Sequence, residues 1–377
     1  MASISVPGWQ IKSKKSVQRS WNNLSIDGGR NMLVNDKKLR DLCQKLFEAA
    51  GIPRNEALIN ADNLVDADLK GVSSHGATRM AVYLKRLRLG LVRPNVKIDI
   101  IHETPGTALV DVNNSMGAAA SYKVMQMAIE KARKTGISFI TVRNSNHFSA
   151  AAYYTQLAVK SNMIGFAGSN GPARVAPWGG KKPLFGTSPF SIAVPAGKHF
   201  PVIADMATSI VARGKIILAA KKGDSIPPGW ARDKEGKDTT NAQDALAGTV
   251  LPFGGPKGYA ISTIIEILTG ILANSAYTTQ INDLNADFEH ATYTSHYFGA
   301  INIAAFGDID NFKMRMDQFI DQVKNSPKGT GVNEIYLPGE IELRKKKYSL
   351  QNGIDLADVT IRELKNACEQ LNVPFSL

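Results

Sequence analysis

Three side chains with complementary chemistry recur at every fourth position in one short segment. If residues 73–89 form a helix, His75, Arg79 and Tyr83 share one face, because residues four apart lie one above the other. Histidine exchanges protons near neutral pH, arginine binds a carboxylate through two parallel hydrogen bonds, and the phenol adds a further donor. The row suits a small acid substrate, although it is also typical of an ordinary exposed helix face with a capping serine.

A second histidine, His147, lies between a β-branched run at 137–142 and a helical stretch that begins at Ser149. Ligands of α/β proteins bind where strands end. Ser149, Ala150 and Ala151 are small, so that a flat or phosphorylated group can approach the N-terminus of this helix. A histidine that is satisfied by hydrogen bonds within a turn explains the pattern equally well.

A glycine-rich loop, Gly254-Gly255-Pro256-Lys257-Gly258, places one cation at the start of another helix. Such a loop suits contact with a phosphate or a ribose, although most loop glycines only make turns. The sequence contains neither G-x-G-x-x-G nor G-x-x-x-x-G-K-[ST], so a dinucleotide enzyme on this chain would not use the usual Rossmann fingerprint. It also lacks H-E-x-x-H and any Cys/His cluster, and we expect no metal site.

The elements that must position these residues alternate between helix and strand after a helical beginning. Apolar spacing predicts helices at 36–50 and 55–69 before the His75 segment. It predicts two strands within 98–112, and then a mixture of helices at 118–134, 252–272 and 311–324 with strands at 137–142, 163–167, 190–194, 202–204 and 298–304. Residues 221–249 are expected to form a long surface excursion. Thr360 and Glu363 predict a capping box for a last helix.

The predicted fold class is α/β, with a helical unit at the N-terminus. We expect a basic extension at 1–30, an N-terminal helical and substrate domain at 31–118 that is completed by 311–377, and a cofactor-binding α/β domain at 119–310. The change to alternating helix and strand near Gly117 motivates the boundary.

Composition narrows the class of protein. The chain has 377 residues, 44% of them hydrophobic, and 45 Lys plus Arg against 33 Asp plus Glu give a net charge of +12. No apolar run is long enough to span a bilayer. Only Cys43 and Cys368 are present, which favours a reducing compartment and a cytoplasmic location. The acid-free segment 1–26 leaves organellar import open. The basic runs lack aromatic interleaving, so we expect no specific nucleic-acid binding.

Six segments, in this order, resemble the type-2 malate/L-lactate dehydrogenase family, which also includes ureidoglycolate and sulfolactate dehydrogenases, diketogulonate reductase and cyclic-imine reductases. The segments are 67–76, 144–148, 176–180, 205–209, 254–259 and 337–340, and the resemblance covers roughly residues 31–370. It implies an oxidoreductase that uses NAD or NADP, with NAD slightly preferred, a non-Rossmann fold with a mixed central sheet, and a homodimer.

The resemblance also implies roles for individual residues. His75, supported by Ser74, exchanges the proton at the substrate oxygen, while Arg79, Tyr83 and Thr187 bind the substrate. His147 is assigned either to catalysis or to the cofactor-binding turn. The positions that match cofactor contacts are His147, Phe148, Ser149, Ala150, Ala151, Asn170, Ala204, Asp205, Met206, Lys257, Pro338, Gly339 and Glu340.

This chain departs from the family pattern at several positions. Ser149 stands where the family usually has glycine, and a side chain there is expected to crowd the cofactor. Pro256 and Ala260 vary the glycine-rich loop. Lys215 follows Arg213 and Gly214 where imine-reducing members carry an acid, which disfavours the imine-reductase interpretation.

The predicted function is reversible hydride transfer between NAD(P) and C2 of a small 2-hydroxy/2-oxo acid such as malate or L-lactate. A general base is required, because removal of hydride leaves a cation unless the hydroxyl proton departs. Arg174, Arg213 and Lys215 are candidates for a second substrate carboxylate, although nothing in the sequence places them in a pocket. The alternatives are a reductase of a 2-oxo sugar acid, ureidoglycolate or a cyclic imine, and a non-enzymatic basic binding protein.

Overall fold

A mixed seven-stranded sheet occupies the centre of the computed structural model, which describes residues 32–377. The strand order is β2-β3-β4-β11-β5-β6-β7, and β3 and β4 are parallel whereas the other neighbouring pairs are antiparallel. The strands are β2 (Asp99–Glu103), β3 (Thr107–Asp111), β4 (Ile137–Ser145), β11 (Thr294–Asn302), β5 (Met163–Ser169), β6 (Phe190–Val194) and β7 (Val202–Met206). This arrangement confirms the predicted non-Rossmann α/β fold with a mixed central sheet.

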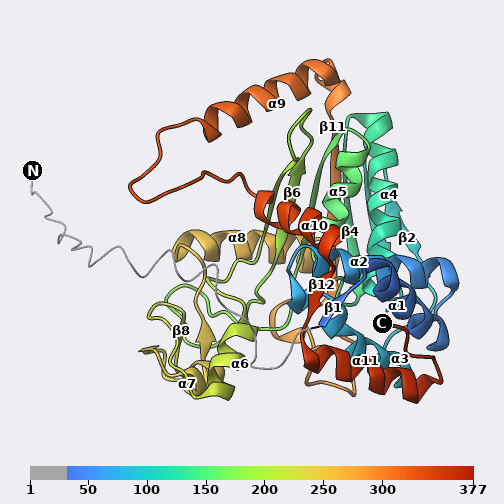
Figure 1. Ribbon diagram of the computed structural model, residues 1–377, viewed down its shortest axis with the longest axis vertical. Coiled ribbons are helices and arrows are strands. Elements are labelled where there is room, and N and C mark those ends of the chain that lie inside the picture. Colours follow the sequence, from blue (N-terminus) through green and yellow to red (C-terminus); the bar gives the residue numbers. More distant parts are fainter. Residues whose placement is uncertain (1–31) are drawn as a thin grey trace, which may run out of the picture.

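Two helices, α4 (Gly117–Thr135) and α5 (Ala152–Lys160), cover one face of this sheet and share an apolar core with it (Figure 1). Gly165 on β5 lets α5 approach closely, because a Cβ at that position would lie 2.8 Å from the Cβ of Ala158. Helix α8 (Pro256–Glu266) continues into a π-helical turn at 267–271, which contacts β4 and β11. The predicted helix at 252–272 therefore begins later, at the proline that favours a first helical turn.

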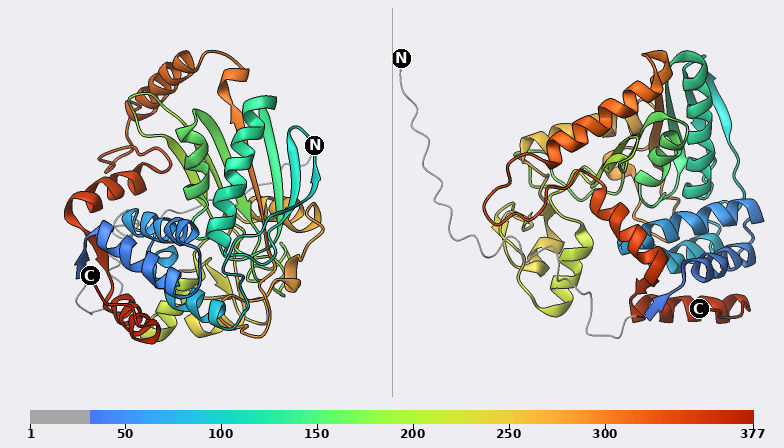
Figure 2. Two further views of the ribbon diagram at one scale, coloured as in Figure 1. Left: turned by 90° about the vertical axis from the view of Figure 1, so that its right-hand side faces the viewer. Right: turned by 45° about the horizontal axis from the view of Figure 1, so that its top comes forward.

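The N-terminal helical unit combines both ends of the described chain. Helices α1 (Asp36–Ala49), α2 (Arg54–Leu69) and α3 (Met80–Arg88) pack with α11 (Asp358–Leu371), and β1 (Met32–Val34) pairs with β12 (Ile354–Leu356) (Figure 2). Leu364 on α11 is fully buried in this core, which confirms that the last helix docks on the body. The predicted capping box is wrong, because α11 already begins at Asp358 after an N-cap Ala357 without a side-chain cap, and Thr360 is buried inside the helix.

Residues 221–249, which were predicted as a surface excursion, fold with the preceding helix into a small unit that has a core of its own. It contains α6 (Arg213–Lys222), α7 (Ala242–Ala247) and the three-stranded sheet β10-β8-β9, formed by Thr249–Val250, Ala231–Arg232 and Asp238–Thr239. Ile216, Ile226 and Val250 are buried together there. The apolar residues of this core stand singly among turn residues, so the sequence has no periodic pattern that predicts it.

Two further helices extend the second half of the chain. Helix α9 (Ile309–Lys324) stands apart at the top of Figure 1, and Ile320 is its one buried residue. Helix α10 (Glu340–Asn352), which was not predicted, contains the basic run 344–347, and Arg344 and Lys346 form ion pairs with Glu340 and Asp66. Because β2 and β3 join the central sheet while α9 stands apart, the domain boundaries at 118 and 311 stay a prediction. The predicted extension at 1–30 lies outside the described residues.

Candidate active site

The His75 segment is not one continuous α-helix, so the prediction of a single helix over 73–89 is wrong. Two single turns of 3-10 helix, Ser73–His75 and Ala77–Arg79, precede α3, and the extended backbone of Gly76 separates them. The cause is Asp68, whose Oδ2 accepts the N–H of Ala77 at 2.7 Å and whose carboxyl fills the space where a Cβ on residue 76 would lie. Burial raises the pKa of Asp68 to about 7.

The predicted chemistry nevertheless converges in space. The rings of His75 and His147 stack with centroids 5.5 Å apart, and the Tyr83 hydroxyl lies 2.5 Å from Nδ1 of His147. Ser74 does not cap a helix; its Oγ lies 2.9 Å from Nδ1 of His75. Arg79 donates from Nε to the carbonyl oxygen of Ser74 at 2.6 Å. Five of the six side chains named for catalysis or substrate binding, all except Thr187, thus meet where the N-terminal helical unit touches the end of β4.

Both histidines are held in the neutral form. Burial, together with the charge of Arg79, lowers the pKa of His75 to about 4. Burial and the same guanidinium lower the pKa of His147 well below its ordinary value. Arg79 has no carboxylate within ion-pair distance among residues 32–377, so its charge acts on the two rings without compensation. Imidazole rather than imidazolium is therefore the resting state of this pair.

Hydrogen bonds distinguish the two rings. The backbone N–H of Ser149, which can only donate, lies 3.4 Å from Nδ1 of His147. Nδ1 of His147 is therefore an acceptor, and its proton resides on Nε2. The partner of His75 is the Ser74 hydroxyl, which can accept as well as donate. His75 can therefore hold its proton on Nδ1 and present the lone pair of Nε2, whereas neutral His147 presents an N–H.

The side chain of Ser149 connects the two segments that carry the histidines. Its backbone adopts a left-handed conformation with φ of +65°, where glycine is the usual residue. Its Oγ donates to the carbonyl oxygen of His75 at 2.7 Å, and the side chain is buried. The hydroxyl therefore points toward the His75 turn.

The start of α5 lies beside β7 and the turn before α10. Asp205 Oδ2 accepts the N–H of Ala152 at 3.2 Å, and the N–H of Ile203 donates to the carbonyl oxygen of Pro338 at 2.9 Å. Gly339 has a φ of +82° and packs so closely on β7 that a Cβ would lie 2.7 Å from the Cβ of Ile203. Three segments predicted to contact a cofactor, 149–151, 204–206 and 338–339, are thereby linked in one region.

Comparison with known proteins agrees with this geometry. The family model described as malate/L-lactate dehydrogenase matches residues 34–365. The chain belongs to the malate/L-lactate dehydrogenase family. It is 38% identical over 345 residues to the malate/(S)-sulfolactate dehydrogenase of Methanothermus fervidus, covering 92% of this chain and 100% of the relative.

Solved structures of the malate/L-lactate dehydrogenase family superimpose well on this fold. The sulfolactate dehydrogenase of Methanocaldococcus jannaschii has a TM-score of 0.86 at 38% identity, over 91% of this chain and 98% of that one. The malate dehydrogenase of Entamoeba histolytica has a TM-score of 0.88 at 31% identity, over 92% and 100%. Relatives whose names specify NAD(+) and relatives whose names specify NADP(+) both match. The predicted family and the predicted enzyme class, an NAD(P)-dependent 2-hydroxyacid dehydrogenase, are confirmed.

Some residues carried over from the family pattern are committed to other contacts. Phe148 is buried and stacks on His296 with centroids 4.4 Å apart. Asn170 accepts the N–H of Ser295 and donates to the carbonyl oxygen of Ala276. Glu340 is ion-paired with Lys324 and Arg344. Each side chain therefore shapes a neighbouring segment, and its role toward a cofactor stays a prediction.

The remaining predicted residues lie outside this cluster of contacts. Thr187 offers its carbonyl oxygen to the N–H of Thr208 and is partly exposed. Lys257 lies exposed in the first turn of α8, and no carboxylate lies within ion-pair distance of it in the described part of the chain. Met206 is 42% exposed, and Ala150 and Ala204 are partly exposed, so that these positions remain accessible to a ligand.

Two site residues were missed by the sequence analysis. Asp68 lies inside a segment that carries the family resemblance, but only its burial shows that it supports the Ala77 turn. His296 is fully buried between Ser169, Ser145 and the carbonyl oxygen of Asn146, and its ring stacks on Phe148. The apolar run that follows His296 in β11 was the available signal of its burial.

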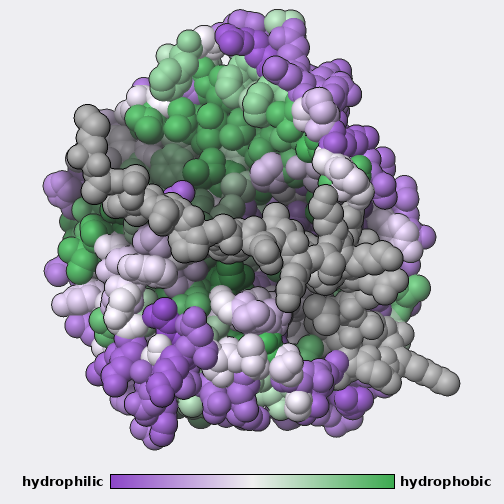
Figure 3. Space-filling model, turned by 90° about the vertical axis from the view of Figure 1, so that its left-hand side faces the viewer, coloured by the Kyte–Doolittle hydropathy of each residue, from purple (hydrophilic) through white to green (hydrophobic). Residues whose placement is uncertain are grey.

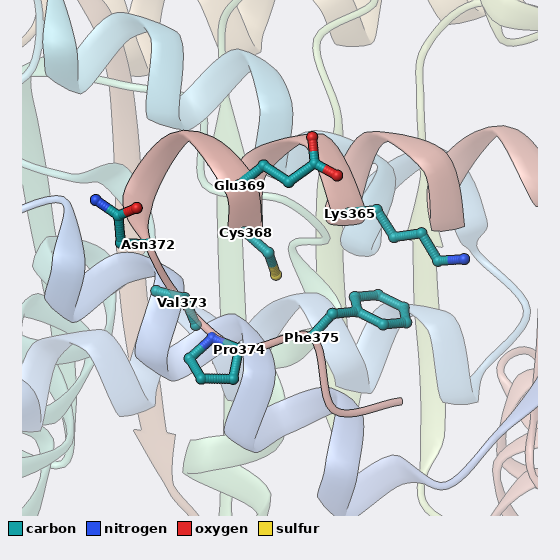
Figure 4. A pocket seen from close by; sticks show the side chains of 7 residues that line it. All are labelled: Lys365, Cys368, Glu369, Asn372, Val373, Pro374 and Phe375. Atoms are coloured by element: carbon teal, nitrogen blue, oxygen red, sulfur yellow. The ribbon is translucent and has the colours of Figure 1, made fainter.

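Other kinds of site are not evident in residues 32–377. No group of three or more potential metal ligands occurs among them, and no helix there combines the length and apolar character that crossing a bilayer requires. A shallow pocket lies along α11 and the C-terminal residues, where the Lys365 ammonium stands over the Phe375 ring (Figure 4). None of the predicted site residues lines that pocket.

Proposed function

We propose that the protein transfers a hydride reversibly between a nicotinamide cofactor and C2 of a small 2-hydroxy acid such as malate or L-lactate. The observation that carries this proposal is an uncompensated guanidinium, Arg79, beside two neutral histidines, one of which can present a lone pair. A carboxylate binds at the guanidinium while the adjacent hydroxyl meets the imidazole. When bound, the nicotinamide ring accepts or supplies the hydride.

His75 is the proposed proton carrier. Its neutral form, with the proton on Nδ1 facing Ser74, has a free Nε2 lone pair that accepts the substrate hydroxyl proton during oxidation. Ser74 stabilises this tautomer by accepting the Nδ1–H, as the partner of a catalytic imidazole commonly does. In the reducing direction the same nitrogen returns the proton to the developing alkoxide.

Arg79 is proposed to bind the substrate carboxylate. A bound carboxylate offsets the guanidinium charge that disfavours protonation of His75, so substrate binding raises the basicity of the imidazole. His147 is proposed to donate from Nε2 to a substrate oxygen, and Tyr83 holds its ring by bonding Nδ1. Under this proposal His75 is the acid–base residue and His147 orients the substrate.

The region around the start of α5 is proposed to bind the dinucleotide. Its fit rests on the small residues Ala150 and Ala151 before α5, on accessible Met206 at the end of β7, and on the exposed ammonium of Lys257. Asp205 keeps exposed surface, yet desolvation raises its pKa to about 6. We propose NAD over NADP, because the Asp205 carboxylate would repel an additional phosphate.

A cofactor-by-substrate activity matrix tests the function. Malate, L-lactate, sulfolactate, ureidoglycolate, a 2-oxo sugar acid and a cyclic imine are assayed with both cofactors. Turnover of simple 2-hydroxy acids with a lower KM for NAD supports the proposal. Turnover restricted to the sugar acid, ureidoglycolate or imine selects an alternative enzyme, and binding of nucleic acid without any turnover selects the basic binding protein.

We further propose that the active form is a homodimer. Apolar side chains are exposed on β6, α8 and α9, among them Ile192, Ile264 and Phe319. Figure 3, which shows the left-hand side of Figure 1, has apolar surface gathered in a hollow in its upper part. Monomers rarely leave such extended apolar surface uncovered. An interface of roughly 1,000 Å² or more is expected. Sedimentation of the active enzyme tests this, and an active monomer contradicts it.

A cytoplasmic location is also proposed. Cys43 and Cys368 are both free and buried, which fits a reducing compartment. Fusion of residues 1–30 to a fluorescent protein tests the alternative, because import of the fusion into an organelle would contradict a cytoplasmic location.

A further inference from the structure

Two partly buried arginines lie close to each other near the Arg79 side of the site. Arg174 forms an ion pair with Asp283, and its Nη1 donates to the carbonyl oxygen of Ala173. Arg213 begins α6, and its Nη2 donates to the carbonyl oxygen of Leu246 at 3.2 Å. No carboxylate lies within ion-pair distance of Arg213 anywhere in 32–377. The pair therefore holds two guanidinium charges against one carboxylate.

Both charges are partly desolvated. Burial and the neighbouring Arg213 charge lower the pKa of Arg174 to about 10, and burial lowers the pKa of Arg213. A guanidinium has five N–H donors, and the contacts above use only part of that capacity at either residue. Partly desolvated, like-charged groups with spare donors are stabilised by an anion that binds both.

A short turn connects this pair to the proposed catalytic residues. Asp283 Oδ1 accepts the N–H of Asn285 at 2.8 Å, and Asn285 Oδ1 faces Nη1 of Arg79 at 3.4 Å. The carboxylate that contacts Arg174 and the amide that contacts Arg79 thus belong to one turn. A substrate whose first carboxylate lies on Arg79 would extend along this turn toward Arg174.

We propose that Arg174 and Arg213 form the subsite for a second anionic group on the substrate, a carboxylate or a sulfonate attached to C3. This inference rests on the proposed function and deepens it, because it selects dianionic 2-hydroxy acids over monoanionic ones. Asp283 sets the strength of selection: it offsets one of the two charges, so that a net single positive charge receives the second anion. Asn285 keeps the two anion sites at a fixed separation.

Kinetics of charge-neutral variants test the subsite. Wild type, Arg174→Gln, Arg213→Gln and the paired variant Arg174→Gln/Asp283→Asn are assayed with malate, sulfolactate and L-lactate. The paired variant leaves no unmatched carboxylate if the single change at 174 impairs folding. Arg232→Gln is the matched control, because it removes an arginine from an ion pair with Asp238 on the same small unit, away from the turn.

We expect wild type to prefer both dianions over lactate by kcat/KM, and each Gln variant to lose about tenfold or more on both dianions, the typical value of one charge-assisted contact. Lactate turnover should change by less than about threefold, and Arg232→Gln should retain the wild-type preference. Malate carries a carboxylate at this position and sulfolactate carries a sulfonate. Loss of activity on only one of the two acids therefore assigns the subsite to that acid's anionic group.

Four results would overturn the subsite. Equal losses on dianions and lactate would make the arginines structural. An unchanged dianion preference in Arg213→Gln and in the paired variant would remove both residues from selection. A changed ratio of KM for NADP and NAD with unchanged substrate preference would assign the arginines to the cofactor. Absence of turnover of all three acids by wild type contradicts the proposed function itself, whereas wild-type turnover without a dianion preference contradicts only the subsite.

Discussion

Tyr83 and His147 are joined by a hydrogen bond of 2.5 Å between the phenol oxygen and Nδ1, across 64 residues of sequence. Burial raises the pKa of the Tyr83 hydroxyl, so the phenol keeps its proton and donates it to the ring. The bond connects α3 of the helical unit to the turn after β4. Together with the Ser149 hydroxyl that donates to the His75 carbonyl oxygen, this bond holds the two halves of the proposed site in register.

Tyr83→Phe tests that connection. The change deletes the phenol oxygen and leaves the ring, and it removes one of the two donors that hold His147 in its Nε2–H tautomer. We expect kcat to fall roughly 10-fold, because a misoriented hydrogen-bond donor costs about 1–2 kcal/mol in a buried site. Steady-state kinetics with circular dichroism separates this from unfolding. An unchanged kcat would show that His147 does not need Tyr83.

Arg79→Lys tests the proposed carboxylate site. Lysine keeps the positive charge but lacks the planar fork that meets a carboxylate at two points. It also loses the Nε–H that bonds the carbonyl oxygen of Ser74. We expect the KM for the substrate to rise by roughly 10-fold or more while the affinity for the cofactor is nearly unchanged. Equal weakening of substrate and cofactor binding would instead indicate a structural role.

The raised pKa of Asp68 should make the stability of the protein depend on pH. Its pKa is raised from 3.8 to about 7 in the folded protein, so the folded state binds one more proton than the unfolded state between those values. Stability from this group is therefore full below about pH 4 and is lost as the pH rises to about 7. The loss is at most roughly 4 kcal/mol, from about three pKa units.

Asp68→Asn checks this dependence. The amide oxygen can still accept the N–H of Ala77, but it carries no charge to desolvate. We expect urea unfolding of the variant to show a flatter dependence of the free energy of unfolding on pH between 4 and 7 than wild type. Parallel curves for the two proteins would show that another group titrates. Gly76→Ala provides a second check, because its Cβ would overlap the Asp68 carboxyl, and it should destabilise the protein at every pH.

The elements of regular spacing were predictable from the sequence, and the contacts between them were not. Leu39, Leu46 and Leu364 follow apolar periods and are buried as expected. The helix break at Gly76 could not be predicted from the sequence, because it depends on the carboxylate of Asp68, eight residues earlier in the chain. The small unit around Ile226 was also missed, because its core residues stand singly between turns.

In the candidate site, too, residue types were predictable from the sequence and the contacts between residues were not. Residue types identified His75, Arg79, Tyr83 and His147 as candidates, and the structure brings them together. Their tautomers and protonation depend on backbone groups such as the Ser149 N–H, which no side-chain pattern encodes. Ser149 was expected to crowd the cofactor as a replacement for glycine. In the structure it adopts the left-handed conformation and bonds the His75 carbonyl oxygen, and its effect on a bound cofactor stays a prediction.

His75→Asn decides between catalysis and an ordinary surface turn. Asparagine is short and polar, and it should preserve the fold in this 3-10 turn while removing the proton carrier. We expect kcat to fall by roughly 10²–10⁴, the usual contribution of general acid–base catalysis. Cofactor binding, measured by quenching of protein fluorescence or by calorimetry, should persist because the proposed cofactor contacts lie at the start of α5.

The pH profile gives the same variant a second readout. In the free enzyme the pKa of His75 is lowered to about 4, so kcat/KM for hydroxy-acid oxidation should lose activity only as the pH falls toward 4. A bound carboxylate on Arg79 raises that pKa, so the acid limb of kcat should lie at higher pH than the limb of kcat/KM. His75→Asn should remove the enzyme's contribution to both limbs.

His147→Asn is the comparison that assigns the chemistry. If His147 only donates a hydrogen bond, its loss should raise KM and lower kcat by less than the loss of His75, and the acid limb should remain. Near-normal turnover of His75→Asn together with an inactive, cofactor-binding His147→Asn would make His147 the acid–base residue. The tautomer argument would then be wrong, because Nδ1 of His147 would have to release the Ser149 N–H before Nε2 could accept a proton.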